Sequence, residues 1–226
     1  MPAPPPTSDT QRADAARNRR ALLDAARAVF GDRGLEAALD EIARRAGVGN
    51  ATLYRHFPSR CALVAAVFAD TLHDVAAAAR TALANPDPWD GFRDYVTFLC
   101  KLQAADRGLA DLLTTAISGA PELEDLRANA YDDFVRIVER AKQAGGLRAD
   151  FQPDDLVLLL MGNAGLVHRT AGAAPAAWER MLSYTLDGLR ESAATSSAPS
   201  LGQDAVLQAM RSQTGMFDAR DHAATT

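Results

Sequence analysis

The sequence predicts an all-α protein, and three observations favour this fold class. Apolar residues recur every three or four positions along most of the 226-residue chain, which is the period of an amphipathic helix. Glycine and proline interrupt this pattern at intervals that suit helix ends. No alternation of apolar and polar residues is long enough for a convincing sheet. A hydrophobic content of 48% with 23% charged residues is typical of soluble globular proteins.

The first helix is predicted from Arg17 to Arg33, followed by Gly34 as its stop. Its apolar face is made by Leu22, Ala26, Val29 and Phe30. The Pro-rich residues 1–12 before it are expected to form a disordered arm. Arg17 lies in the first turn, where the helix dipole disfavours a cation, so it indicates either an anionic partner such as phosphate or a solvated surface arginine.

Residues 38–57 read ALDEIARRAGVGNATLYRHF and predict a helix-turn-helix. The first helix buries a face made of Leu39, Ile42, Ala43 and Ala46. Gly47 supplies the positive φ of a tight turn, and Val48 fills the corner. The second helix is expected to run from Asn50, as its N-cap, to Phe57, where Pro58 closes it.

This second helix presents a polar surface suited to DNA. Leu53 and Phe57 face inward, which turns outward Asn50, Ala51, Thr52, Arg55 and His56. Two short helices joined by a glycine turn can place the second helix in the major groove. Its polar side chains can then bind phosphates and read base edges. The alternative is a small amphipathic helix pair that binds nothing.

Residues 17–72 resemble the DNA-binding domain of the TetR family of transcriptional repressors. The run Thr52-Leu53-Tyr54-Arg55-His56-Phe57, followed by Pro58-Ser59-Arg60, carries the resemblance. It implies a three-helix DNA-binding domain over residues 13–72, with DNA contacts from Arg17, Arg44, Arg45, Asn50, Ala51, Thr52, Tyr54, Arg55, His56 and Arg60. In particular, Arg60 replaces a lysine that the family directs at phosphate. The chain departs from the family at Ala38, usually a threonine N-cap, and at Cys61, usually an acid.

Charge is divided unevenly along the chain. Residues 11–72 contain ten basic and seven acidic side chains, whereas residues 73–226 contain fourteen basic and twenty-one acidic ones. The net charge of −5 therefore hides a positive N-terminal part on an acidic remainder, which suits a small phosphate-binding surface. An excess of this size also arises by ordinary sampling.

The remainder reads as further helices. An apolar stripe predicts a long helix from Ser59 to about Leu83, and residues 85–88, NPDP, break the chain after it. Five helices are expected in a helical domain over residues 73–192, at about 92–105, 109–117, 121–145, 155–170 and 178–189. Residues 193–226 are expected to form a flexible tail with at most one weak helix over 201–213.

The helix at 155–170 bears on assembly. Residues 156–161, LVLLLM, are apolar on all sides, so they must be covered on more than one side. Gly162 and Gly165 permit close backbone approach. We expect this helix and the last one, 178–189, to form a four-helix interface in a homodimer. Burial within one monomer is the alternative. A dimer matters because paired recognition helices meet major grooves about 34 Å apart.

The resemblance implies that the C-terminal domain is a ligand-binding and dimerisation domain, in which a small-molecule effector releases the protein from DNA. Such a ligand must prefer the state that cannot bind DNA. Candidate lining residues combine apolar bulk with a few polar tips: Phe92, Tyr95, Leu99, Tyr131, Phe134, Met161, His168 and Trp178. Each of them also fits an ordinary core position.

The sequence contains no catalytic or metal-binding pattern. Its four histidines lack ligand spacing, no GxSxG or P-loop occurs, and Asp154-Asp155 suits a helix start. Cys61 and Cys100 are far apart, so buried or idle thiols are favoured over a disulfide. We expect no enzyme activity, cofactor or metal. No apolar run approaches the ~20 residues of a membrane helix and no signal peptide is evident, which favours the cytoplasm.

The prediction is therefore a ligand-responsive transcriptional regulator, in the first place a repressor, that binds palindromic double-stranded operator DNA as a homodimer. A DNA-binding activator, or a constitutive DNA binder without ligand, is the stronger alternative because no residue separates repression from activation. A helical interaction module without DNA binding is the second alternative.

Overall fold

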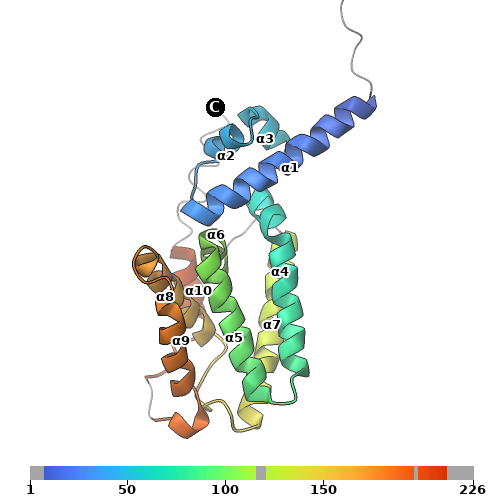
Figure 1. Ribbon diagram of the computed structural model, residues 1–226. Coiled ribbons are helices and arrows are strands. Elements are labelled where there is room, and N and C mark those ends of the chain that lie inside the picture. Colours follow the sequence, from blue (N-terminus) through green and yellow to red (C-terminus); the bar gives the residue numbers. More distant parts are fainter. Residues whose placement is uncertain (1–7, 116–120, 196–197, 213–226) are drawn as a thin grey trace, which may run out of the picture.

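The computed structural model describes residues 8–115, 121–195 and 198–212 (Figure 1). Within these ranges the fold is helical and contains no strand, which confirms the predicted fold class. The helices are α1 (Ser8–Arg33), α2 (Leu39–Arg45), α3 (Asn50–His56), α4 (Arg60–Ala84), α5 (Pro88–Ala105), α6 (Arg107–Thr114), α7 (Pro121–Gln143), α8 (Asp155–Thr170), α9 (Ala177–Gly188) and α10 (Gln203–Ser212), with a 3-10 turn at Glu191–Ala193.

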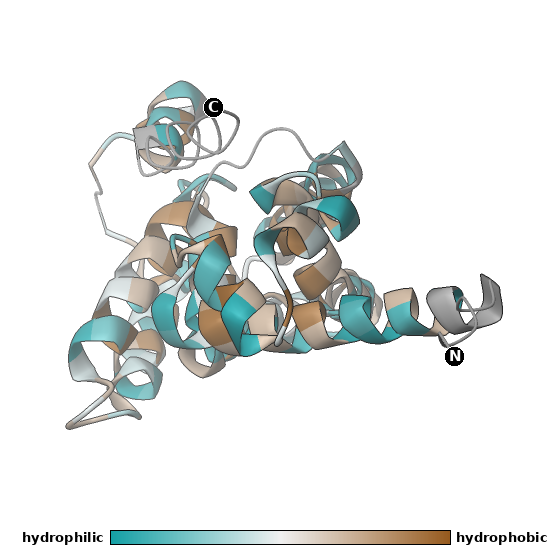
Figure 2. Ribbon diagram, turned by 90° about the horizontal axis from the view of Figure 1, so that it is seen from above, coloured by the Kyte–Doolittle hydropathy of each residue, from teal (hydrophilic) through white to brown (hydrophobic). Residues whose placement is uncertain are grey.

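Helices α1–α3 form a small unit, the head, at one end of the molecule (Figure 1). Its core is made by the predicted apolar faces: Leu22, Ala26, Val29, Phe30, Leu39, Ile42, Ala43, Leu53 and Phe57. α1 begins at Ser8, so residues 8–12, expected in a disordered arm, belong to this helix, and residues 1–7 lie outside the described part. The N-terminal part of α1 extends beyond the other helices in both views (Figures 1 and 2).

Helix α4 connects the head to the remaining helices, which we call the body (α5–α10). Ser59 caps its first turn by accepting a hydrogen bond from the backbone N–H of Ala62 at 3.1 Å. α4 is the single helix of the described part that is long and apolar enough to cross a membrane by length and composition, against our expectation of none. In the fold it packs against α1, α5 and α7, with Phe68, Leu72 and Val75 buried.

Polar caps set the boundaries of the next two helices. The carboxylate of Asp87 accepts hydrogen bonds from the N–H groups of Trp89 and Asp90, which starts α5 after the proline-rich break. Asp106 accepts from Leu109 N at 3.0 Å and starts α6 directly after α5. The Asp106 cap explains why a single residue separates the end of α5 from the start of α6.

The body has a core of its own, built around aromatic rings. Phe92 is fully buried, and its ring centroid lies 5.5 Å from that of Phe151 and 6.1 Å from that of Phe134. Trp89 and Tyr95 complete this cluster. Hydrophobic ribbon lies mainly toward the middle of the molecule in Figure 2. This core fixes α5 against α7, and both helices contribute residues to a cavity in the body.

The C-terminal segment is more structured than we predicted. Residues 203–212 form α10, where we expected a flexible tail with at most a weak helix. Val206 and Met210 are 3% and 7% exposed, because this amphipathic helix buries its apolar face on the body. Residues 196–197 and 213–226 of the expected tail lie outside the described part.

Candidate nucleic-acid interface and cavity

The turn between α2 and α3 has the predicted geometry. Gly47 has a φ of +70°, a conformation that is strained for residues with a Cβ. Its N–H donates to Arg44 O at 3.2 Å, and the next N–H, of Val48, donates to Ala43 O at 3.0 Å. Val48 is half-buried and packs on the head core. The turn therefore fixes the angle at which α3 leaves α2.

Helix α3 presents part of the predicted surface to solvent. Asn50, Ala51 and Arg55 are exposed, and Thr52 is half-buried. Gly49 occupies the N-cap position and no side chain caps the helix, so the predicted capping role of Asn50 is wrong. Asn50 is the first helical residue instead, and its side chain is exposed at the surface.

Besides Thr52, two further residues of the predicted DNA-contacting set are only partly exposed. Tyr54 is half-buried and packs against the head core. His56 is also half-buried, with its Nε2 atom buried and its ring centroid 6.4 Å from that of Phe57. Because both side chains are half-buried, only their exposed edges can contact DNA.

The exposed arginines of the head are available in different degrees. Arg44, with a side chain 78% exposed, lies 3.9 Å from the Glu41 carboxylate. Arg45 is exposed in the same turn. Arg17 is 73% exposed and pairs with Asp14 at 2.6 Å on α1. Such surface pairs contribute only about 0–1 kcal/mol, so a phosphate can compete for these guanidinium groups.

Arg60 contradicts the predicted phosphate contact. It is 6% exposed, and its Nη1 donates hydrogen bonds of 2.7 Å to the carbonyl oxygens of Leu35 and Ala37. The first turn of α4 lies beneath the loop that joins α1 to α2, and this position directs the side chain inward. Arg60 is thus a residue that holds the head together, and the phosphate role predicted for it is wrong.

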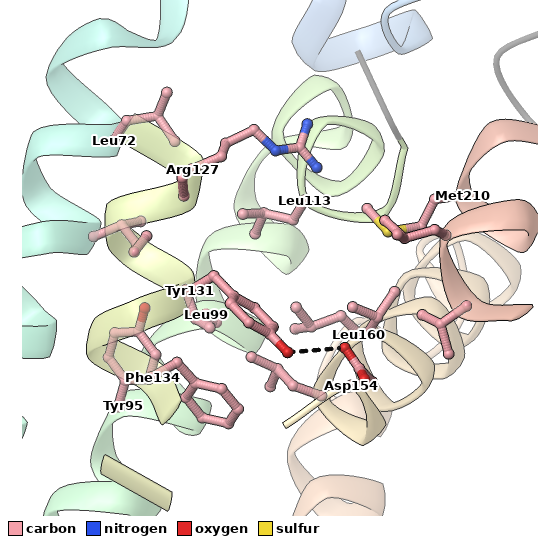
Figure 3. Close-up of a pocket in the computed structure, with 17 residues that line it drawn as sticks. Leu72, Tyr95, Leu99, Leu113, Arg127, Tyr131, Phe134, Asp154, Leu160 and Met210 are labelled. Carbon is pink, nitrogen blue, oxygen red and sulfur yellow. Dashed lines mark hydrogen bonds between the residues drawn. The ribbon is translucent and has the colours of Figure 1, made fainter. Parts of the chain in front are cut away.

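The body contains a cavity of about 310 Å³ that is partly open to solvent and is lined by residues of α4, α5, α6, α7, α8 and α10, together with Asp154 (Figure 3). Four of the predicted residues line it, namely Tyr95, Leu99, Tyr131 and Phe134. The residues missed by the sequence analysis are Leu72, Val75, Leu113, Arg127, Ala128, Ala130, Asp154, Leu156, Val157, Leu160, Val206, Leu207 and Met210. The lining is therefore apolar apart from a few groups, as in ligand pockets.

The other four predicted cavity residues lie elsewhere. Phe92 and Trp178 are buried in the body core, where their rings pack on other helices. Met161 is half-buried on α8 and His168 is exposed near its C-terminal end. These residues were predicted to line the cavity because they are large and have helical spacing. Neither property distinguishes a residue of a cavity wall from one of the packed core.

Two polar features stand in the cavity wall. Arg127 of α7 points its guanidinium into the space (Figure 3), and its Nη1 is buried without a hydrogen-bond partner in the described part of the chain. Burial lowers the pKa of this guanidinium. The hydroxyl of Tyr131 donates to the Asp154 carboxylate at 3.1 Å. Burial and this hydrogen bond raise the pKa of Tyr131.

Helices α8 and α9 leave an apolar surface uncovered. Met181 and Tyr184 of α9 are 57% and 56% exposed, and Leu158 of α8 is 37% exposed. Gly162 and Gly165 have open space where a Cβ would stand. Only Leu160 and Asn163 are buried on α8, so the monomer does not cover this helix as its sequence requires.

Side chains of metal-ligating types and two cysteines occur among the residues that the structure describes. No group of three or more histidine, cysteine or acidic residues that could hold a metal is found among the described residues. Cys61 and Cys100 are free cysteines in the structure, and burial raises the pKa of the Cys100 thiol to about 12. A thiol with such a pKa stays protonated and unreactive near neutral pH.

Comparison with known proteins agrees with this geometry. A family model described as bacterial regulatory proteins, tetR family, matches residues 22–67. A second model, described as the C-terminal domain of SbtR-like transcriptional regulators, matches residues 87–191. The first match covers the head from residue 22 onward with part of α4, and the second covers the body from α5 as far as the 3-10 turn.

Individual relatives are transcriptional regulators. The HTH-type transcriptional repressor LfrR of Mycolicibacterium smegmatis is 34% identical over 139 residues, which are 61% of this chain and 70% of the relative. The HTH-type transcriptional activator FasR of the same organism is 47% identical over 66 residues, 29% of this chain and 30% of the relative. A TetR-family regulator from Agrobacterium tumefaciens shares the fold, with 19% identity, a TM-score of 0.57 and coverage of 78% of this chain and 99% of that one. The chain belongs to the TetR family of transcriptional regulators.

Proposed function

We propose that this protein is a ligand-responsive repressor that binds palindromic operator DNA as a homodimer and is released by a small-molecule effector. The observation that carries the proposal is the position of α6. Its Leu113 lines the cavity, and its Asp111 accepts a 2.9 Å hydrogen bond from the N–H of Leu35 in the head. A ligand that moves α6 therefore acts directly on the loop that precedes the helix-turn-helix.

The contact between α6 and the head is close enough to transmit such a movement. A Cβ added to Gly108 would lie 2.9 Å from Phe30 Cβ and 3.0 Å from Phe68 Cζ. Glycine at this position lets α6 touch both α1 and α4. Protein interiors are close-packed, and a gap between α6 and the head would lose contacts. We therefore expect a shift of α6 to move the head with it.

DNA binding is assigned to the exposed residues of α3 with the arginines beside it. Asn50, Ala51 and Arg55 are the exposed candidates for base edges. Arg17, Arg44 and Arg45 suit phosphate contacts, with Thr52, Tyr54 and His56 contributing through their accessible edges. Arg60 is not included, because its guanidinium is used inside the head.

The exposed apolar face of α8 and α9 supports a homodimer. Leu158, Gly162 and Gly165 lie on one face of α8, and Met181 with Tyr184 continues this surface on α9, which packs beside it. A second copy of the chain would cover it and form a four-helix interface. The arrangement would set the two α3 helices for grooves about one turn, ~34 Å, apart.

Activation of transcription is the second candidate. The relative with the higher identity, over 66 residues, is named an activator, and the longer match is named a repressor. A head shared by both kinds of regulator does not decide the direction of control. We place the protein in the cytoplasm, where operator DNA is accessible to it.

A gel-shift experiment with the promoter DNA that flanks the coding region tests the proposal. We expect retardation by a dimer and relief of that retardation by a small molecule that binds the cavity. Retardation that no ligand relieves would favour a constitutive binder, and none at any salt concentration would favour an interaction module. Transcription from the same promoter, with and without the protein, separates repression from activation.

A further inference from the structure

The cavity combines a large apolar wall with a guanidinium, that of Arg127, whose Nη1 has no hydrogen-bond partner among the described residues. Its volume of about 310 Å³ lies at the lower end of the ~300–1,000 Å³ range of ligand pockets. Leucine, valine and methionine side chains form most of its surface, and α10 covers it through Val206 and Met210. This lining favours an apolar molecule, while the charged groups decide what head group that molecule carries.

Arg127 is the unusual member of the wall. Its Nη1 is buried and meets no hydrogen-bond partner among the described residues, and burial is the sole cause of its lowered pKa. A second arginine of the same helix, Arg140, instead directs its guanidinium to the backbone carbonyls of Leu83 and Asn85. Because a buried donor without an acceptor is costly, the Nη1 of Arg127 favours an anionic partner that none of the described residues supplies.

The second polar feature has a partner already. The half-buried Asp154 accepts a hydrogen bond from the hydroxyl of Tyr131, which satisfies part of the hydrogen-bonding capacity of its carboxylate. In Figure 3 the Tyr131–Asp154 pair and the Arg127 guanidinium lie toward different ends of the space, with Leu113 between them. A carboxylate at Asp154 repels a ligand anion, so the anion is directed to Arg127.

We propose that the cavity binds a small apolar molecule with a single carboxylate, held by Arg127 and with its hydrocarbon part against α4, α5, α8 and α10. One cation and a nearby acid suit a monoanion better than a doubly charged phosphate. Arginine donates to a carboxylate in a planar, bidentate geometry. This proposal rests on the proposed function and names the chemical class of its effector.

A series of linear carboxylates from butanoate to dodecanoate tests the proposal on the full chain. Each acid is compared by calorimetry with the alcohol and the amine of the same chain length. We expect the acid of the best-fitting length to bind at least about tenfold more tightly than its alcohol, because a charged hydrogen bond is gained. The amine is expected to bind more weakly than the alcohol.

Two variants make the test specific. Arg127→Leu should bring the affinity for the acid down to that for the alcohol and leave the affinity for the alcohol within about twofold, because only the charged contact is removed. Arg136→Leu on the same helix is the matched control, since the Arg136 side chain is 67% exposed and pairs with Asp133. This control should retain the tenfold preference.

Several outcomes would overturn the proposal. Equal affinity for acid and alcohol in the wild type, binding led by the amine, or no measurable binding of any acid in the series would each exclude it. So would an acid preference that survives in Arg127→Leu. A gel shift with promoter DNA, measured in parallel, distinguishes the failure of this proposal from the failure of the proposed function. Intact DNA binding without carboxylate binding would reject the carboxylate as the ligand class but would leave the proposed DNA-binding regulator standing.

Discussion

Two arginines, Arg60 buried in the head and Arg127 half-buried beside the body cavity, have opposite surroundings. The guanidinium of Arg60 donates two 2.7 Å hydrogen bonds to backbone carbonyls of the α1–α2 loop. The guanidinium of Arg127 faces an apolar cavity, and its Nη1 has no partner in the described part of the chain. A satisfied guanidinium stabilises the fold around it, whereas an unsatisfied one costs stability unless a ligand pairs with it. The comparison thus separates a structural arginine from a binding one.

Removal of the Arg60 side chain is the strongest test of this comparison. We expect Arg60→Met to lower the free energy of unfolding by about 2–4 kcal/mol, because two buried carbonyl oxygens lose a charged donor. Urea unfolding followed by circular dichroism measures the change. Arg45→Met, which alters an exposed arginine of α2, is the control and should lie within about 0.5 kcal/mol of the wild type. A similarly small effect at position 60 would show that Arg60 does not hold the head together.

An exposed arginine of α3 should behave in the opposite way. Arg55→Ala is expected to weaken operator binding by about 1–3 kcal/mol, with a change in sequence preference, because it removes a candidate base contact. Its unfolding curve should match that of the wild type. Fluorescence anisotropy on operator and unrelated DNA gives both affinities. If affinity for the operator stays unchanged while stability falls, Arg55 is part of the core.

The variant Arg127→Leu tests the second arginine of the comparison, the one assigned to ligand binding. Without ligand we expect this variant to be as stable as the wild type or more stable by about 1 kcal/mol, since a half-buried guanidinium with an unpaired, buried Nη1 is replaced by an apolar side chain. Urea unfolding in ligand-free buffer measures the difference. A loss as large as that expected for Arg60→Met would mean that Arg127 also has a structural partner.

The smallest effect concerns Asp111, which holds the same loop from the body side by accepting from Leu35 N. Burial raises the pKa of Asp111 above its usual value of 3.8, although the Leu35 hydrogen bond and Arg107 oppose this. A raised pKa means that the folded state binds the proton more tightly. Its contribution to stability is therefore complete below the unfolded pKa and is lost as the pH rises through the folded pKa.

Asp111→Asn should remove that pH dependence and keep an acceptor for Leu35. We expect the stability difference between wild type and variant to shift in favour of the variant as the pH rises from just below 4, and thermal unfolding across this range measures it. A difference that is constant with pH, or that moves the other way, would mean that the pKa of Asp111 is not raised.

The sequence predicted the helices well because their signals are local. Gly47 and the spacing of Leu53 and Phe57 determine the helix-turn-helix within a few residues, and the NPDP break marks where α4 ends and α5 begins. The direction of Arg60 was not predictable, because it depends on a loop about 25 positions earlier that folds over the first turn of α4.

The cavity was only partly predictable for the same reason. Residues of six helices line the cavity. The apolar periodicity of a helix identifies the face that points inward, but it does not show whether that face packs against another side chain or borders an empty space. Arg127 lies in the polar run PELEDLRANAYDD, where an arginine reads as solvent-exposed. The helix α10 was underestimated because its stability comes from packing on the body rather than from its own ten residues.

The central claim is that the cavity controls the head, and one measurement tests it directly. Operator affinity is determined by fluorescence anisotropy for the wild type and for Arg127→Leu, with and without the carboxylate that binds best. We predict equal affinity of the two proteins without ligand, and a marked loss of affinity on adding the carboxylate in the wild type alone. Operator binding that the bound carboxylate leaves unchanged in the wild type would contradict the account.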